Sequence, residues 1–215
     1  MKPFCFVHAA DLHLDGPFSG GGINTPELRE ALCEATFAAL RNIVNLSIEC
    51  KADFLIIAGD LFDCANKSLR AQLRLRDELC RLSERGIPTF IAHGNHDHLQ
   101  GWRASLVWPP GVHFFGCEGV ECLPIVKDGV TIAEIYGISH RGPALKDNLV
   151  REFRGRGRAF SIGVLHANVG GNTGHDDYDP CTVEDLRNAG MDYWALGHVH
   201  ARRELYDGVT LAIYP

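Results

Sequence analysis

The sequence predicts an α/β fold in which two packed mixed β-sheets are flanked by helices. Three observations predict it. Apolar segments of strand length alternate with helical patterns in the first half, which favours a mostly parallel sheet. In the second half, three short apolar segments follow one another without a long helix, which favours antiparallel pairing. Acid, amide and imidazole side chains come directly after five apolar segments, as expected where strand ends share one edge.

The composition is typical of one globular domain spanning residues 1–215. The apolar fraction of 46% is ordinary, and no apolar run approaches the roughly 20 residues of a membrane helix. The first apolar segment is short and is interrupted by His8 and Asp11, unlike a signal peptide. The formal net charge of −6 argues against a free-standing electrostatic nucleic-acid binder, since such proteins are usually basic.

The eight cysteines include no C-x-x-C pair. Several of them, such as Cys5 and Cys33, lie within apolar or helical patterns, so we interpret them as reduced core or near-surface residues. A zinc site using Cys117 and Cys122 is the weaker alternative, because no second pair accompanies them. Together with the N-terminus, the cysteines favour a cytoplasmic location.

The first half of the chain predicts a βαβαβ arrangement. A Gly-rich loop, Ser19 to Gly22, follows the first strand. Thr25 then caps a helix whose first residue is Pro26, which is a favoured start. In order, the expected elements are a strand at about 3–9, the helix from Pro26, a strand at 53–58, a helix at 68–85 and a strand at 88–93.

The second half predicts more strands and shorter helices. Thr182 with Asp185 resembles a capping box and begins a helix of about 182–189. The other expected elements are strands near 112–115, 120–126, 130–137, 160–165, 192–197, 202–206 and 209–214, and a short helix near 144–150. We expect the first three of these strands to pair antiparallel.

Seven oxygen and nitrogen donors at the five strand ends predict a metal site. They are Asp11, His13, Asp60, Asn95, His166, His198 and His200. In an extended segment residues i and i+2 point the same way, so Asp11 and His13 can reach one ion. His198 and His200 have the same spacing. The Asp60 carboxylate has two oxygens and can bridge two ions. Because the set contains no sulfur, it suits manganese, iron or zinc.

Such a site suits phosphodiester hydrolysis. Two divalent ions with the carboxylates of Asp11 and Asp60 leave about two positive charges, which attract a diester, activate a water nucleophile and stabilise phosphoryl oxygens. His96 lies beside Asn95 and cannot easily face the same ion, so we expect it to act as general acid on the leaving group. We expect Asp97 to orient and charge the His96 imidazole.

The remaining histidines and two tryptophans have less support. We expect His8 and His93 to be hydrogen-bonded supports near strand ends. Surface or loop positions are expected for His98, His113, His140 and His175. His175 is the best placed of these for contact with substrate. Trp102 and Trp108 follow the Asn-His-Asp loop, where packing is the favoured role and stacking on a nucleobase is the alternative.

Four segments carry a resemblance to a known family. They are His8 to Leu14, Ala58 to Asp63, Gly94 to Asp97 and Ala195 to His200. With them the chain resembles the calcineurin-like metallophosphoesterases and, among these, the SbcD-like DNA repair exonucleases, relatives of the nuclease subunit of Mre–Rad complexes. The resemblance covers essentially the whole chain and implies a four-layer αββα fold. The protein phosphatases of the superfamily carry Asp-Arg-Gly where this chain has Asp63-Cys64-Ala65, so that branch fits poorly.

The resemblance implies two metal ions and a catalytic histidine. One ion would be held by Asp11, His13, Asp60 and His200. The other would be held by Asp60, Asn95, His166 and His198, with Asp60 bridging. His96 would lie near the scissile phosphate. Manganese is the ion that the resemblance implies, with Fe²⁺ and Zn²⁺ as alternatives.

The leading hypothesis is a manganese-dependent DNA exonuclease or endonuclease acting on DNA ends in repair. One alternative is a small-molecule phosphodiesterase acting on cyclic nucleotides or nucleotide diphosphate esters. Another is a non-catalytic, metal-dependent scaffold for an ATPase. The implied partners are DNA and an ATPase of the SbcC/Rad type, with a homodimer left open. Family nucleases carry a DNA-capping region after the core, and we expect this chain, which stops at Pro215, to be a fragment without it.

Overall fold

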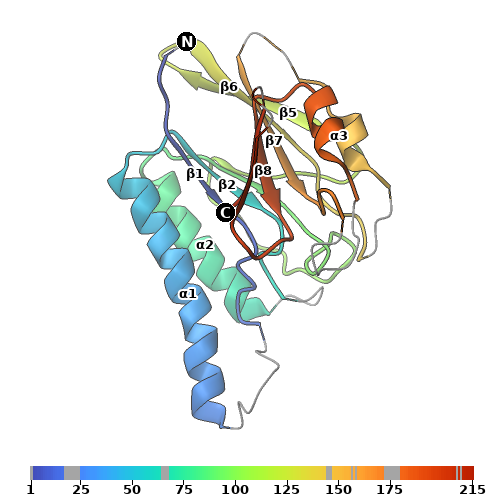
Figure 1. Ribbon diagram of the computed structural model, residues 1–215. Helices are drawn as coiled ribbons and strands as arrows, with labels where there is room; N and C mark the ends of the chain where they lie inside the picture. The colour runs from blue at the N-terminus through green and yellow to red at the C-terminus, as the bar shows by residue number, and fades with distance from the viewer. Residues whose placement is uncertain are drawn as a thin grey trace.

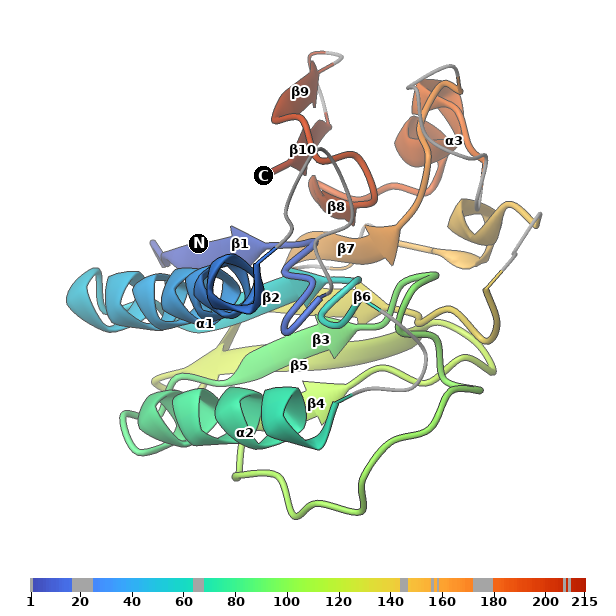
Figure 2. The ribbon, with the colours of Figure 1, turned by 90° about the horizontal axis from the view of Figure 1, so that it is seen from below.

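The computed structural model describes residues 2–16, 25–63, 68–143, 147–155, 157, 159–171, 180–206, 208 and 210–215. Within them two β-sheets pack against each other, and helices cover both outer faces (Figures 1 and 2). The Gly-rich loop expected at 19–22 and His175 lie outside these residues. No helix in this part of the chain combines the length and apolar character needed to cross a membrane.

The first sheet is parallel and has the strand order β1-β2-β3-β4. Its strands are β1 (Phe6–Ala9), β2 (Phe54–Ala58), β3 (Thr89–Ala92) and β4 (Val112–Phe114). Two helices, α1 (Pro26–Glu49) and α2 (Leu69–Ser83), alternate with the first three strands and pack on one face of the sheet. The βαβαβ prediction is confirmed.

The second sheet is mixed and has the order β5-β6-β7-β8-β10-β9. Its strands are β5 (Glu121–Lys127), β6 (Val130–Gly137), β7 (Phe160–His166), β8 (Tyr193–Gly197), β9 (Arg203–Tyr206) and β10 (Leu211–Tyr214). The two outer pairs, β5 with β6 and β9 with β10, are antiparallel, and the inner pairs are parallel. The short helices η1 (Leu149–Glu152) and α3 (Val183–Asn188) contribute to the hydrophobic cluster on its outer face.

Side-chain alternation along β2 accounts for the layers. Leu55 and Ile57 belong to the cluster under α1 and α2, whereas Phe54, Ile56 and Ala58 belong to the cluster between the two sheets. All five residues are fully buried, as expected for a parallel strand covered on both faces. The expected α/β fold of two packed sheets flanked by helices is therefore confirmed.

The helix starts also agree with the sequence. The Thr25 side chain accepts a hydrogen bond from Leu28 N, and Pro26 is the first residue of α1. Thr182 and Asp185 form the capping box: the Thr182 side chain accepts from Asp185 N at 3.1 Å, and the Asp185 carboxylate accepts from Thr182 N at 2.9 Å. The short helix expected near 144–150 corresponds to the 3₁₀ helix η1, which begins at Leu149, and residues 144–146 lie outside the described residues.

The pairing of β4 differs from the prediction. Of the three strands expected to pair antiparallel, only β5 and β6 do so, while β4 joins the first sheet beside β3 in parallel. A parallel neighbour needs a crossover connection, and that crossover usually contains a helix. Here residues 93–111 make the crossover with no helix, so the sequence carries no helical signal for it. Figure 2 shows this connection as a long open trace beyond α2.

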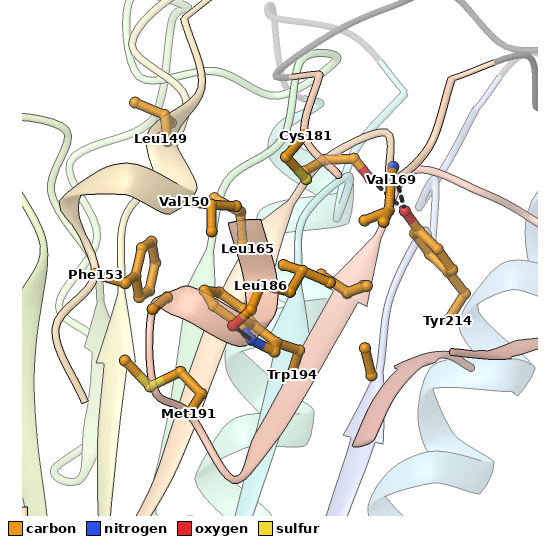
Figure 3. Close-up of a cluster of buried hydrophobic side chains, with 14 of the residues drawn as sticks. Leu149, Val150, Phe153, Leu165, Val169, Cys181, Leu186, Met191, Trp194 and Tyr214 are labelled. Atoms are coloured by element: carbon orange, nitrogen blue, oxygen red, sulfur yellow. Dashed lines mark hydrogen bonds between the residues drawn. The ribbon is translucent and has the colours of Figure 1, made fainter. Parts of the chain in front are cut away.

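Two buried aromatic side chains hold the outer side of the second sheet (Figure 3). Trp194 of β8 donates from Nε1 to Leu186 O in α3 at 3.2 Å. Tyr214 of β10 donates from its hydroxyl to Ala167 O at 2.7 Å and accepts from Val169 N at 3.0 Å. Since a buried hydroxyl needs such partners, Tyr214 anchors the segment that directly follows β7.

No disulfide bond joins the cysteines of the described residues. Cys181 is buried in the cluster of Figure 3, whereas Cys5 and Cys50 are exposed. Cys64 lies outside the described residues.

Candidate metal centre

The strand ends bring the predicted ligands together. The C-terminal ends of β1, β2, β7 and β8 point to the same side of the molecule (Figure 1). The main-chain pairing of β1 with β2 continues into the loops that follow them. Asp11 N donates to Gly59 O at 3.1 Å, and His13 N donates to Asp60 O at 3.0 Å. The first two ligand segments are thus held to each other by their own main chains.

The main chain at the ligands is strained. Seven described residues other than glycine have a positive φ, and four of them are predicted ligands: Asp11 (55°), His13 (42°), Asp60 (48°) and His198 (102°). Residues with a Cβ rarely adopt this region, and such strain gathers at functional sites. The backbone therefore supports a functional reading of these loops independently of their donor atoms.

Two glycines allow close approach inside the site. A Cβ at Gly94 would lie 2.2 Å from Asp60 Oδ1, and a Cβ at Gly197 would lie 1.8 Å from Ala58 O. Both distances are far below van der Waals contact, so a larger residue would displace the carboxylate or the end of β2. The glycines that precede Asn95 and His198 are explained by this packing.

Asp11, His13 and His200 form the open donor group. One ligand atom from each lies within 4.8 Å of the other two. His13 Nε2 is 3.3 Å from His200 Nε2, which in turn is 3.8 Å from Asp11 Oδ1. His200 is exposed, while Asp11 and His13 are half-buried. Two imidazole nitrogens that face each other beside a carboxylate suit a shared cation.

Asp60, Asn95, His166 and His198 form the buried donor group, and each is at most 8% exposed. His166 Nε2 lies 3.2 Å from Asp60 Oδ2 and 3.0 Å from Asn95 Oδ1. His166 Nδ1 lies 3.1 Å from Ala58 O, which can only accept, so Nδ1 is the donor there and Nε2 faces the oxygens. The His198 ring packs against the His166 ring at 5.3 Å between centroids.

Asp60 lies between the two donor groups. Its Oδ2 atom is 3.2 Å from His166 Nε2 in the buried group and 4.0 Å from His13 Nε2 in the open group. Its Oδ1 atom accepts a hydrogen bond from His96 N at 3.0 Å. Asp60 would therefore be the carboxylate shared by ions held in the two groups. The seven predicted ligands are thus brought together, and their assignment to two ions stays a prediction.

The electrostatics of the donor groups fit bound cations. Burial raises the pKa of Asp11 to about 6, although the neighbouring His166 opposes the shift. Burial alone would lower the pKa of His166, but the carboxylates of Asp60 and Asp11 outweigh it and raise that pKa to about 9. Without metal, a proton on His166 thus supplies the positive charge that the buried carboxylates need. The oxygen and nitrogen donors present fit divalent ions in its place.

Metal affinity is therefore expected to rise with pH. A metal-binding imidazole must be neutral, so binding below pH 9 must expel the His166 proton, and affinity should increase by about tenfold per pH unit until pH passes about 9. Below about pH 6, protonation of Asp11 should weaken binding further. Manganese titrations by calorimetry at pH 7, in buffers of different ionisation enthalpy, would measure the released proton. A binding enthalpy that is the same in all buffers would contradict the expectation.

His96 lies at the exposed side of the site, and Asp63 holds it. Its Nδ1 atom is 3.1 Å from Asp63 O and 3.9 Å from Asp63 Oδ1. The same Oδ1 atom is 2.9 Å from His13 Nδ1. Because the Asp63 oxygens only accept, both Nδ1 atoms are the donors, which leaves His13 Nε2 free for a metal ion. Asp63 was not among the predicted site residues, although it ends the second motif.

The expected contact between Asp97 and His96 was wrong. The Asp97 carboxylate is fully buried and accepts hydrogen bonds from Leu61 N, Gly94 N and His93 Nδ1. In the turn formed by residues 94–97, this carboxylate folds back onto Gly94 N while His96 projects outwards, so the two neighbours face different ways. Asp97 ties together the loops that carry Asp60 and Asn95.

The supporting histidines were only partly foreseen. His93 is hydrogen-bonded to Asp97, and His8 Nδ1 lies 3.1 Å from the Tyr193 hydroxyl, as expected of supports. His98 and His140 lie in loops, within the surface or loop positions expected for them, but both are buried. His140 Nε2 donates to His166 O at 2.7 Å and thus braces a predicted ligand. An isolated histidine at a strand end gives no sequence signal for that role.

Known proteins resemble this chain over most of its length. The sequence model described as calcineurin-like phosphoesterase matches residues 5–202. The chain is 44% identical over 216 residues to an uncharacterized metallophosphoesterase, YhaO, from Bacillus subtilis, covering 100% of this chain and 53% of that protein. It is also 30% identical over 174 residues to the DNA double-strand break repair protein Mre11 of Thermoplasma acidophilum, covering 76% of this chain and 45% of that one.

A second Mre11, from Sulfurisphaera tokodaii, is 29% identical over 207 residues, covering 94% of this chain and 50% of that protein. The chain therefore spans about half the length of the curated relatives it matches. A solved structure with 13% sequence identity superposes with a TM-score of 0.51, over 83% of this chain and 85% of its own. At that identity the likeness shows the fold alone.

Proposed function

The chain belongs to the calcineurin-like phosphoesterase family, and from that premise we propose that it is a two-metal, manganese-dependent nuclease acting on DNA ends. One observation carries the proposal. Two touching groups of oxygen and nitrogen donors share Asp60, and His96 stands beside them on the exposed side. The likeness to two Mre11 proteins, each named for DNA double-strand break repair, supports DNA as the substrate.

The residues divide the work between binding and proton transfer. When bound, the two divalent ions supply an activated water and offset the charge of the phosphate. The side chains of His200 and His96 are 55% and 45% exposed, so a diester can approach from their side. His96 Nδ1 is held by Asp63, which leaves Nε2 to donate a proton to the departing oxygen. Asp63 thereby positions both His96 and His13.

A small-molecule phosphodiesterase is the second candidate. The formal net charge of −6 favours it, because a long polyanion is repelled by an acidic protein outside the site itself. The partners proposed for the nuclease are an ATPase of the SbcC/Rad type and a second copy of the chain, in the cytoplasm. Their support is the resemblance to nucleases of Mre–Rad complexes.

A substrate panel separates the candidates. Single-stranded DNA, double-stranded DNA, cyclic nucleotides and bis-p-nitrophenyl phosphate would each be incubated with the protein and manganese, with EDTA in parallel. The nuclease proposal expects manganese-dependent cleavage of DNA that EDTA abolishes. Hydrolysis of cyclic nucleotides without cleavage of DNA would replace it with the small-molecule activity. If no diester is hydrolysed, both enzyme candidates are rejected and the non-catalytic, metal-dependent scaffold remains as the hypothesis.

A further inference from the structure

A second cavity lies behind the catalytic loops, on the helix side of the first sheet. Its volume is about 290 Å³, and its walls include Phe62, Gln72, His93, Arg103, Trp108 and Phe114. Phe62 follows β2, His93 follows β3 and Phe114 ends β4, so the cavity opens at the same ends of these strands as the metal centre. The proposed chemistry does not use it.

Aromatic rings line this cavity. Trp108 and Phe114 pack at 4.8 Å between centroids, and the His93 ring lies parallel to Phe114 at 5.5 Å. Trp108 is half-buried and Arg103 is exposed at the cavity. A planar ring that enters here meets an indole on which it can stack and a guanidinium that can lie over its face.

Residues 103–106 line one wall of the cavity without closing it. The Gln72 side chain, from the first turn of α2, accepts a hydrogen bond from Ala104 N at 2.9 Å and holds the segment in place. The large apolar side chains on either side of the lining residues turn to solvent instead of filling the space: Trp102 is 53% exposed and Val107 is 91% exposed. The Gln72 contact thus fixes this wall of the cavity, and neither Trp102 nor Val107 is buried in it.

The pocket shares residues with the loops of the metal centre. His93 Nδ1 is 2.9 Å from Asp97 Oδ2, and that carboxylate also holds Leu61 N and Gly94 N. Phe62 lies between Leu61 and Asp63, whose carbonyl holds His96. A ligand in the pocket would therefore contact residues directly bonded to the catalytic loops.

We infer that this pocket binds a nucleobase, supplied either by the substrate strand or by a free nucleotide. This inference rests on the proposed function, since that function brings nucleotides to the site. The volume is near the lower end for ligand pockets and suits one base rather than a peptide segment. Stacking on an aromatic side chain accepts every base, and the Arg103 cation adds to it.

Adenosine 5′-monophosphate is the probe for binding, measured by calorimetry on the protein in EDTA. Wild type is expected to bind it, and Trp108→Ala to weaken binding by about tenfold or more. Trp108→Phe should restore most of the affinity, and Arg103→Ala should weaken it by about two- to fivefold without disturbing the core. Trp102→Ala is the matched control and should bind as wild type does. No binding by wild type, or equal binding by all variants with unchanged melting temperatures, would overturn the inference.

A kinetic arm identifies the source of the base. Were it the substrate strand, Trp108→Ala and Arg103→Ala would raise KM for a dinucleotide but not for its abasic counterpart, whereas Trp108→Phe would change neither KM much. If adenosine monophosphate binds and neither KM changes, the base comes from a free nucleotide. Binding of adenosine monophosphate is measured without metal or turnover. If it fails while nuclease activity is intact, only the inference of a nucleobase pocket is rejected. If adenosine monophosphate binds but no diester is hydrolysed, only the proposed nuclease function is rejected.

Discussion

Replacing His96 by asparagine is expected to lower DNA hydrolysis by about 10²- to 10⁴-fold while manganese still binds. Asparagine has no group that can deliver a proton at neutral pH. The contact between this residue and Asp60 is made by the main-chain N–H, which the replacement keeps. The His96 side chain is 45% exposed, so the fold should not be disturbed. Hydrolysis rates and manganese titrations of both proteins would check this.

The choice of substrate makes that prediction specific to a general acid. The p-nitrophenolate released from bis-p-nitrophenyl phosphate leaves readily without a proton, so His96→Asn should lose much less activity on this diester than on DNA. His113→Asn, on β4 outside the donor groups, is the matched control and should retain activity on both. Equal losses on the two substrates would reject the assigned role, and full activity of His96→Asn would reject any role in catalysis.

Replacing Asp60 by asparagine is expected to abolish tight binding of both ions and, with it, hydrolysis. The carboxylate faces both donor groups, through Oδ2 at 3.2 Å from His166 and 4.0 Å from His13. Removing a residue that only hydrogen-bonds to a metal ligand lowers metal affinity or activity by about 10- to 100-fold. Removing the shared carboxylate itself should therefore lower them by more than that. Asparagine tolerates the left-handed backbone at this position, where φ is 48°.

Melting temperatures measured with and without manganese would show the loss directly. A ligand that binds only the folded state stabilises it, so wild type should melt at a higher temperature with manganese and Asp60→Asn should not. Asp77→Asn, an exposed position on α2, is the matched control and should respond as wild type does. A variant of Asp60 that keeps the manganese shift would show that this carboxylate does not bridge the two groups.

Much of the fold could be read from local patterns. The spacing of apolar residues predicted helices and strands that the structure contains. The helix starts at Pro26 and after Thr182 were predicted from their capping residues. The failure at β4 has a physical cause: strand pairing depends on a connection of residues 93–111 that has no helix and hence no periodic signal. Residues that bridge distant segments were also missed, because a hydrogen bond such as that from His140 to His166 O joins positions far apart in the chain.

The sequence by itself predicted the donor atoms that the structure brings together at the candidate metal centre, because parallel strands place their C-terminal ends together and the donors follow such ends. It also determined that His96 differs from Asn95, since adjacent residues point to different sides. Only the tertiary structure decided which carboxylate accepts a hydrogen bond from which histidine. Asp97 turns inwards to His93, and Asp63 holds both His13 and His96. These pairings depend on how separate loops meet in space, and sequence spacing carries no information about that.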